Sequence, residues 1–177
     1  MIVLGIDPGT AVTGYGVVEG GRMAPPRLIE CGVIRTKPRD PLASRLREIH
    51  AGTVELIQRH RPDVLSIEDV FYSRNVRTTV VLGHARGVIL LAAADAGIEI
   101  AEYPPAEIKK AVVGNGAATK QQIQFMVARL LRLKTAPEPA DASDGVAAAL
   151  AYILGARIPD LKSVLDASGR PTARSRT

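Results

Sequence analysis

IVLGIDPGTAVTGYGVV, residues 2–18, opens the chain with an apolar run that leads into the turn Asp7-Pro8-Gly9. Two further runs rich in β-branched residues follow, GYGVVEGG and RLIECGVIRT. Short runs of this kind are typical of strands, and Gly20-Gly21 between the second and the third is typical of a hairpin connection. The first third of the chain therefore predicts three antiparallel strands.

The pattern then changes to an alternation of helices and strands. Apolar residues recur at helical spacing from Leu42 to Ile57, and DVLSIE, residues 63–68, has the nearly continuous apolar character of a buried parallel strand. The remaining predicted elements are a helix from about Thr78 to Ala96, a strand at 98–103 ended by Pro104-Pro105, a helix after the capping box Thr119–Gln122, and an alanine-rich helix from Asp141 to Ala156.

This order, β-β-β-α-β-α-β-α-α, predicts an α/β fold. We expect a mixed sheet in which an antiparallel three-strand meander is extended by parallel strands, with helices on both faces. The length of 177 residues and the 46% content of hydrophobic residues suit one domain over residues 1–160. Residues 161–177 are expected to be a basic, disordered tail, because they carry arginines and end in SGRPTARSRT.

Composition narrows the function classes. The single cysteine, Cys31, excludes an internal disulfide and a cysteine zinc site, and it is expected to be a small buried residue. The net charge of +5 is compatible with a polyanionic partner. Apolar runs such as Val88 to Ala94 are far shorter than the ~20 residues of a membrane span. We therefore expect a cytoplasmic protein with no membrane partner.

Two acidic residues stand at the ends of predicted strands. Asp7 follows the first apolar run and Glu68 ends the run 63–68, so adjacent parallel strands would place both at one edge of the sheet. Taken alone, Asp7 is equally well explained as a turn residue. Strand alternation separates Glu68 from Asp69 and favours Glu68 only slightly, so the pattern leaves both open.

Asp141 and Asp144 are spaced i,i+3 and would project from one face of the last helix. Taken by themselves they suit N-terminal capping of that helix. Their combination with the strand-end acids changes this interpretation, because converging carboxylates repel unless hard cations such as Mg²⁺ join them. Two such ions ~4 Å apart can activate a water and stabilise a leaving oxygen of a phosphodiester. The pattern thus predicts hydrolysis of a nucleic-acid backbone.

A specific resemblance supports this prediction. Five motifs resemble those of the RuvC family of Holliday-junction resolvases, in order and spacing: GIDPGTAVTGYGVV, IEDVFYSRN, LGHARGV, KKAVVGNGAATKQQIQFMV and DASDGVAAALA. The resemblance implies an RNase H-like fold, a homodimer, and Mg²⁺-dependent cutting of two opposing strands of a four-way DNA junction in recombination and repair. From the chemistry of phosphodiester hydrolysis we expect two ions per site, with Mn²⁺ as an alternative to Mg²⁺. It also implies cooperation with a branch-migration motor complex of the RuvA and RuvB type.

The resemblance also implies roles for residues. The family's four acidic, metal-binding positions fall on Asp7, Glu68, Asp141 and Asp144, which resolves the choice of Glu68 over Asp69. Its basic residues near the cleaved strand fall on Lys109 and Lys120, with Lys120 in a catalytic role. A lysine there can neutralise charge that develops on the phosphate.

The segment after residue 68 is the candidate DNA-contact loop. Phe71 could stack on an unpaired base near the junction centre or cap the edge of the core. Arg74, Asn75 and Arg77 supply polar and cationic groups to the same loop. The small-residue helix from Val80 to Ala94 is the candidate dimer interface, with packing on the sheet as the alternative. A two-fold dimer would present one catalytic cluster to each of two strands.

Three other interpretations compete. GIDPGTAVTG also resembles the phosphate-binding hairpin of actin-like ATPases and sugar kinases, but that fold uses two lobes and 177 residues supply one. A YqgF-type nuclease is a nearer alternative, against which the LGHARG and KKAVVG segments argue. A non-catalytic junction binder is disfavoured because all four candidate metal ligands are present.

Overall fold

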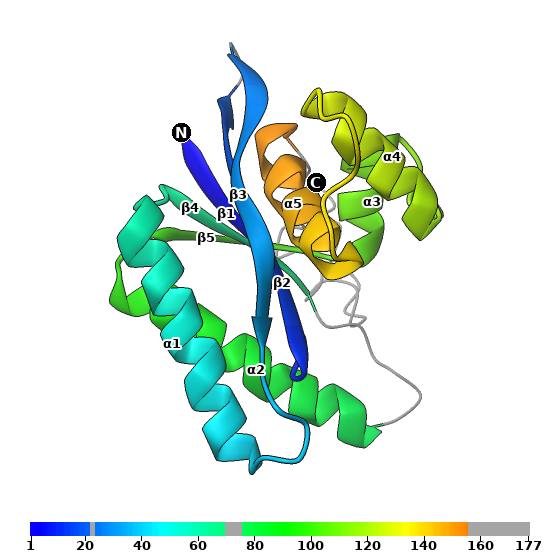
Figure 1. Cartoon of the computed structure of the whole chain (residues 1–177). Coiled ribbons are helices and arrows are strands. Elements are labelled where there is room, and N and C mark those ends of the chain that lie inside the picture. Colours follow the sequence, from blue (N-terminus) through cyan, green and yellow to red (C-terminus); the bar gives the residue numbers. More distant parts are fainter. Residues whose placement is uncertain (22–23, 70–75, 156–177) are drawn as a thin grey trace, which may run out of the picture.

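The computed structural model describes residues 1–21, 24–69 and 76–155. Its elements, shown in Figure 1, are β1 (Ile2–Asp7), β2 (Val12–Gly21), β3 (Ala24–Arg35), α1 (Leu42–His60), β4 (Val64–Glu68), α2 (Val76–Asp95), β5 (Glu99–Tyr103), α3 (Pro105–Val113), α4 (Lys120–Leu130) and α5 (Ala140–Ile153). The predicted tail, residues 161–177, lies outside the described residues.

The five strands form one mixed sheet in the order β3-β2-β1-β4-β5. β1, β2 and β3 pair antiparallel, while β4 pairs parallel with β1 and β5 pairs parallel with β4. The predicted meander with its parallel extension is therefore confirmed. Because β1 and β4 run in the same direction side by side, their carboxyl ends, which carry the predicted acidic residues, lie at the same edge of the sheet.

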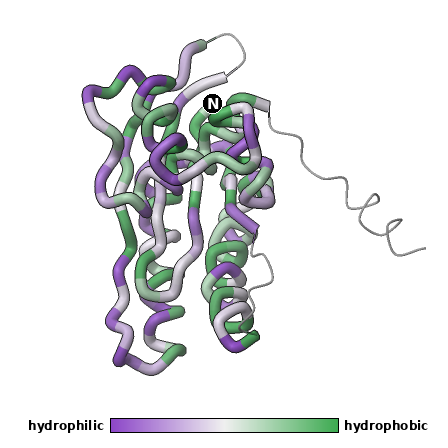
Figure 2. The backbone as a smooth tube through the Cα atoms, turned by 90° about the vertical axis from the view of Figure 1, so that its right-hand side faces the viewer, coloured by the Kyte–Doolittle hydropathy of each residue, from purple (hydrophilic) through white to green (hydrophobic). Residues whose placement is uncertain are grey.

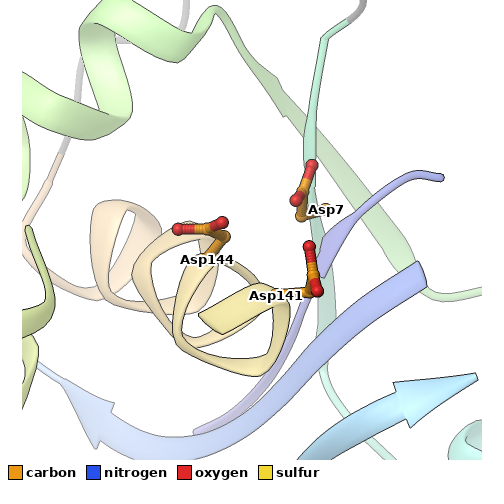
Figure 3. A group of neighbouring side chains, drawn as sticks. All are labelled: Asp7, Asp141 and Asp144. Atoms are coloured by element: carbon orange, nitrogen blue, oxygen red, sulfur yellow. The ribbon is translucent and has the colours of Figure 1, made fainter. Parts of the chain in front are cut away.

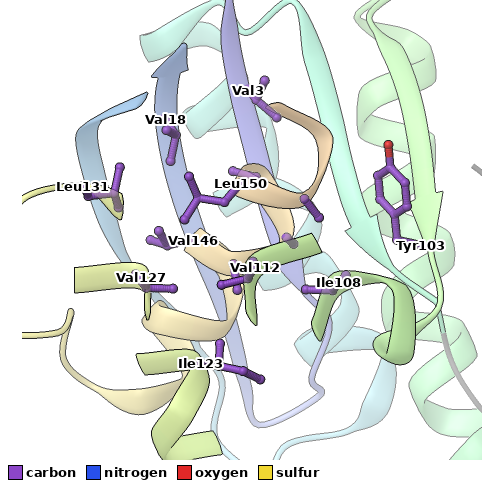
Figure 4. Packing of buried hydrophobic residues seen from close by; sticks show 14 of the residues in the cluster. Val3, Val18, Tyr103, Ile108, Val112, Ile123, Val127, Leu131, Val146 and Leu150 are labelled. Atoms are coloured by element: carbon purple, nitrogen blue, oxygen red, sulfur yellow. The ribbon is translucent and has the colours of Figure 1, made fainter. Parts of the chain in front are cut away.

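Helices cover both faces of the sheet, as predicted (Figure 1). α1 and α2 pack on one face, where the buried side chains include Leu4, Ile6, Val17, Ile49, Leu65, Ile67 and Ile89. α3, α4 and α5 cover the other face, where the buried side chains include Val3, Val18, Val64, Tyr103, Val127, Val146 and Leu150 (Figure 4). Strand alternation sends successive residues of β1 and β4 into these two separate cores.

α5 lies unusually close to β1 and β2, because glycines remove side chains from the contact. A Cβ atom on Gly5 would lie 2.2 Å from the carbonyl oxygen of Gly145, and one on Gly16 would lie 2.6 Å from Cα of Val146. Gly145 in turn faces the backbone of Tyr15, because a Cβ atom on Gly145 would lie 2.5 Å from Cα of Tyr15. The helix that carries Asp141 and Asp144 is thus held against the sheet backbone to backbone.

The predicted element order omitted one helix. Residues 105–113 form α3, whereas Pro104-Pro105 predicted only the end of the preceding strand. Pro105 occupies the first helical turn, where its missing N–H costs nothing, and Gly114 ends the helix in the left-handed conformation with φ of 86°. The helix is only nine residues long, so its apolar periodicity was weak.

The other predicted helices are confirmed with small changes of boundary. α2 begins at Val76 rather than Thr78, and α5 ends at Ile153 rather than Ala156. The capping box forms at α4: the N–H of Gln122 donates to Oγ1 of Thr119 over 3.3 Å, and the N–H of Thr119 donates to Oε1 of Gln122 over 2.8 Å.

α2 is the one helix in the described part of the chain that is long and apolar enough to cross a membrane. Its uninterrupted apolar runs are short, and only the average over the whole helix is apolar. Its buried residues, Ala85, Ile89, Ala92 and Ala93, pack in the core shared with the sheet and α1. A helix that covers a sheet meets the same criteria of length and composition, so these criteria carry no further conclusion. Figure 2 shows the alternation of hydrophobic and hydrophilic residues along the chain.

Candidate active site

Asp7 and Glu68 end the two neighbouring parallel strands. The register pairs Ile6 with Ile67, so the next residue of each strand is Asp7 on β1 and Glu68 on β4. Both side chains lie on the α5 face, the face of Ser66, whose hydroxyl donates to the carbonyl of Ala148 over 2.6 Å. Asp69 turns the other way and pairs with Arg86 of α2 at 3.4 Å. The geometry therefore brings Glu68, and not Asp69, beside Asp7.

The first turns of α5 bring Asp141 and Asp144 to the same place. Asp7 is paired with Gly14 of β2, and a Cβ atom on Gly14 would lie only 1.8 Å from the carbonyl oxygen of Asp141. The absence of a side chain at Gly14 thus allows the start of α5 to rest beside Asp7. One carboxylate oxygen from each of Asp7, Asp141 and Asp144 lies within 4.8 Å of the others (Figure 3).

The four acids share their surroundings with two lysines. A pocket of about 180 Å³ is lined by Asp7, Glu68, Pro105, Ile108, Lys109, Lys120, Ile123, Asp144 and Ala147. Asp141 adjoins it through its closeness to Asp7 and Asp144. Nζ of Lys120 lies 2.7 Å from Oδ2 of Asp144, which places the first residue of α4 directly at the carboxylates.

Burial and the charges of neighbouring acids raise the pKa of three of these carboxyls, Asp7, Glu68 and Asp144. Burial, and then the charges of Asp144 and Asp141, raise the pKa of Asp7 to about 7. Burial, and then the charges of Asp7 and Asp144, raise the pKa of Glu68 to about 7. Burial also raises the pKa of Asp144, although the Lys120 ammonium opposes the shift, and the hydrogen bond to Asp144 raises the pKa of Lys120. The single lysine that contacts the cluster, Lys120, therefore does not offset the repulsion among its carboxylates.

This donor set fits divalent cations of the hard type. All four candidate ligands offer carboxylate oxygens, which Mg²⁺ and Mn²⁺ accept, and three of them already approach within the distance that one ion can bridge. A cation would also remove the repulsion that raises the pKa of Asp7 and Glu68. The residues present therefore fit the metal that the sequence pattern predicted.

The predicted DNA-contact residues are placed only in part. Phe71, Arg74 and Asn75 lie outside the described residues. Arg77, in the first turn of α2, lines a separate pocket with Thr10, Thr78, Val81 and Leu82, and does not line the carboxylate pocket.

Two features of the site were not predicted from the sequence. Gly14 has no functional group, yet its missing side chain is what brings Asp141 to Asp7. Pro105 and Ile108 of α3 form part of the pocket wall, and they were missed together with that helix. The regular spacing of Gly14 and Gly16 on one face of a strand was a usable indication of close helix approach.

Comparison with known proteins identifies the family. The family described as crossover junction endodeoxyribonuclease RuvC matches residues 3–152. The RuvC protein of Desulforamulus reducens is 48% identical over 154 residues, 86% of this chain and 93% of its own length. That of Halorhodospira halophila is 50% identical over 150 residues, 85% of this chain and 88% of its own length.

Solved structures agree with the sequences. Thermus thermophilus RuvC is 37% identical with a TM-score of 0.79, over 87% of this chain and 94% of its own. The same protein in complex with a Holliday junction substrate gives a TM-score of 0.80 at 34% identity, over 90% of this chain and 97% of its own. These matches confirm the predicted RNase H-like fold. The chain belongs to the RuvC family of crossover junction endodeoxyribonucleases.

Proposed function

We propose that this protein resolves four-way DNA junctions by cutting two opposing strands through metal-dependent phosphodiester hydrolysis. The observation that carries the proposal is the convergence of carboxylates from β1, β4 and α5 in one lysine-lined pocket. Family membership supports the reaction class, and the Thermus thermophilus relative, described in complex with a Holliday junction substrate, supports the choice of substrate.

Asp7, Glu68, Asp141 and Asp144 would hold the divalent ions, Mg²⁺ or Mn²⁺. Such ions, when bound, supply an activated water and stabilise the leaving oxygen. Lys120 and Lys109 act on the phosphate itself, because their ammonium groups line the same pocket and can neutralise charge on its oxygens. The apolar part of the wall, formed by Pro105, Ile108, Ile123 and Ala147, strengthens these electrostatic interactions by limiting access of water.

The proposal includes a homodimer formed through α2. Among the large hydrophobic side chains that are exposed in the described residues, three lie on this helix: Val76 at 75%, Val80 at 52% and Leu91 at 53%. Gly83 and Gly87 lie between them in the helix, and a Cβ on either would meet nothing within 4 Å. Two copies of this surface could approach closely. Leu91→Arg should give monomers in sedimentation velocity, whereas Phe125→Arg, at an exposed apolar residue of α4, should leave the dimer intact.

The candidate loop residues Phe71, Arg74, Asn75 and Arg77 belong to the same proposal as contacts with the junction strands. So does a branch-migration motor complex of the RuvA and RuvB type as the partner that delivers the junction. Binding through lysines and arginines should weaken as salt concentration rises, because phosphate contacts release counterions.

The decisive experiment is incision of an end-labelled four-way junction by the purified protein. Symmetric nicks in two opposing strands are expected with Mg²⁺ and none with EDTA, and Asp7→Asn should bind the junction in a mobility-shift assay without cutting it. Full cleavage by Asp7→Asn would remove Asp7 from its proposed role. Failure of the wild-type protein to cut with any divalent metal would overturn the enzymatic proposal.

A further inference from the structure

The residue after Glu68 is held from two sides. The backbone N–H of Asp69 donates to the carbonyl of Tyr103 at the end of β5 over 2.8 Å. The carboxylate of Asp69 pairs with NH2 of Arg86 on α2 at 3.4 Å. These contacts lie where β4 ends at Glu68, and the ion pair with Arg86 fixes the Asp69 side chain in addition to the backbone hydrogen bond to Tyr103.

Arg86 itself is firmly embedded. Its side chain is 18% exposed, and its guanidinium also forms an ion pair with Glu102 of β5. Its Nε is buried without a hydrogen-bond acceptor among the described residues. A planar guanidinium between two carboxylates has little freedom to turn, so Arg86 ties α2, β5 and the segment after β4 together.

Strand alternation connects this tie to the active site. Glu68 faces the carboxylate pocket under α5, and Asp69 faces α2 on the opposite side of the sheet. The two side chains leave consecutive Cα atoms, so holding Asp69 limits the rotation of the peptide unit that it shares with Glu68. The hydrogen bond from the Asp69 N–H to Tyr103 anchors one edge of that peptide unit, and the ion pair of Asp69 with Arg86 adds a second anchor that holds Glu68 beside Asp7.

We propose that Arg86 is a positioning residue for Glu68. It sets the position of the Glu68 carboxylate in the metal pocket by clamping Asp69 from the far side of the sheet. This inference rests on the proposed function only in assuming that Glu68 is a metal ligand. Partners that orient a metal ligand commonly change metal affinity 10–100-fold when they are removed.

The test measures metal binding without DNA and then cleavage. For Arg86→Gln, the dissociation constant for Mn²⁺, measured by calorimetry on metal-free protein, should rise about tenfold. The Mg²⁺ concentration for half-maximal junction cleavage should rise by a similar factor, and junction binding in EDTA should not change. A merely structural loss would lower the thermal midpoint and junction binding while leaving the metal requirement unchanged.

Two comparisons sharpen the test. Asp69→Asn should reproduce the weaker metal binding, and the double variant should be no worse than either single variant, because both remove the same tie. Asp69→Asn can also replace Arg86→Gln in the test if Arg86→Gln does not fold, because the Asp69 side chain is half-exposed. Arg27→Gln, which removes an exposed pair with Glu19 on the β2–β3 hairpin, is the matched control and should bind Mn²⁺ as the wild type does.

The outcomes separate the two proposals. Absence of Mn²⁺ binding and cleavage in the wild-type protein would overturn the proposed function. A wild-type protein that binds and cleaves, together with unchanged Mn²⁺ affinity in Arg86→Gln and Asp69→Asn, would overturn the role of Arg86 alone. Effects that add in the double variant would also overturn it.

Discussion

The two faces of the sheet bring helices and charged groups together in different ways. On the α5 face, the glycines of β1 and β2 meet the helix backbone directly, with a Cβ on Gly5 only 2.3 Å from the N atom of Ala149. On the α1 face, the corresponding glycine, Gly52, faces only side-chain atoms of Ile34, at 3.0 Å and beyond. Backbone contacts cannot relax by changing a rotamer, so the carboxylates of α5 are held at fixed distances from Asp7.

The carboxylates on the two faces also differ in their partners. Near α1, Glu30 accepts a hydrogen bond from the Tyr15 hydroxyl at 2.8 Å and lies within ion-pair distance of His60 and Arg59. Burial opposes ionisation of Glu30, but these donors and charges outweigh it and lower its pKa. On the α5 face Asp7 has acids as its neighbours, and its pKa is raised to about 7. The acids around Asp7 on the α5 face therefore have too few positively charged neighbours. A metal ion bound there would supply the missing positive charge.

The largest effect is predicted for a substitution that disrupts the backbone contact between β1 and α5 at Gly5. Gly5→Ala should lower the free energy of unfolding by at least about 3 kcal/mol, because the new methyl group would overlap backbone atoms of Gly145 and Ala149. Gly52→Ala should change it by less than about 1 kcal/mol, since Ile34 can shift and alanine favours a helix. Urea titrations of both variants test this difference, and equal losses would contradict it.

A second prediction concerns the lysine at the carboxylate cluster. Lys120→Met should slow junction cleavage about 100-fold, because it removes a positive charge at the developing charge of the phosphate. Single-turnover kinetics at saturating protein give the rate. Lys110→Met, at an exposed lysine of α3, is the matched control and should cleave at the wild-type rate. Wild-type cleavage by Lys120→Met would show that its contact with Asp144 is only structural.

A smaller effect is the dependence of stability on pH. The folded-state pKa of Asp7, about 7, lies above its unfolded value, so the folded protein holds more protons between about pH 4 and 7. The contribution of the Asp7 carboxyl to the free energy of unfolding is therefore present at low pH and is lost as pH rises through 7. In EDTA, the free energy of unfolding of Asp7→Asn should therefore exceed that of the wild type at pH 8. This difference should be about 1–2 kcal/mol larger at pH 8 than at pH 5.

Urea titrations at the two pH values measure that difference, and Mg²⁺ gives the complementary result. Metal binding needs ionised carboxyls, so added Mg²⁺ should raise the thermal midpoint of the wild type more at pH 8 than at pH 6. Asp7→Asn should lose most of this gain. A wild-type stability that rises with pH relative to Asp7→Asn would contradict the assigned repulsion.

Much of this architecture was predictable from local patterns in the sequence. The apolar runs that end in Asp7 and Glu68 indicated parallel strands with acids at one edge, and the i,i+3 spacing of Asp141 and Asp144 indicated a shared helix face. These signals lie within short segments, so they survive without knowledge of tertiary contacts. The choice of Glu68 over Asp69 needed the family resemblance, because alternation alone favoured it only slightly.

Other features depend on contacts between distant segments and left little trace in the pattern. The role of Gly14 arises only when α5 packs across β2, and the tie between Arg86 and Asp69 joins elements that no local periodicity connects. α3 was hidden because nine residues give few helical repeats, and its first proline also suits the end of a strand.

The central claim is that the carboxylates of β1, β4 and α5 bind divalent cations together. Anomalous X-ray diffraction from metal-free crystals soaked in MnCl₂ tests it most directly. We predict anomalous peaks at bonding distance from the carboxylate oxygens of Asp7, Asp141 and Asp144, with Glu68 as a further ligand. Crystals soaked at millimolar Mn²⁺ that show no peak in this pocket, with the oxygens left where they lie in the metal-free crystal, would contradict it.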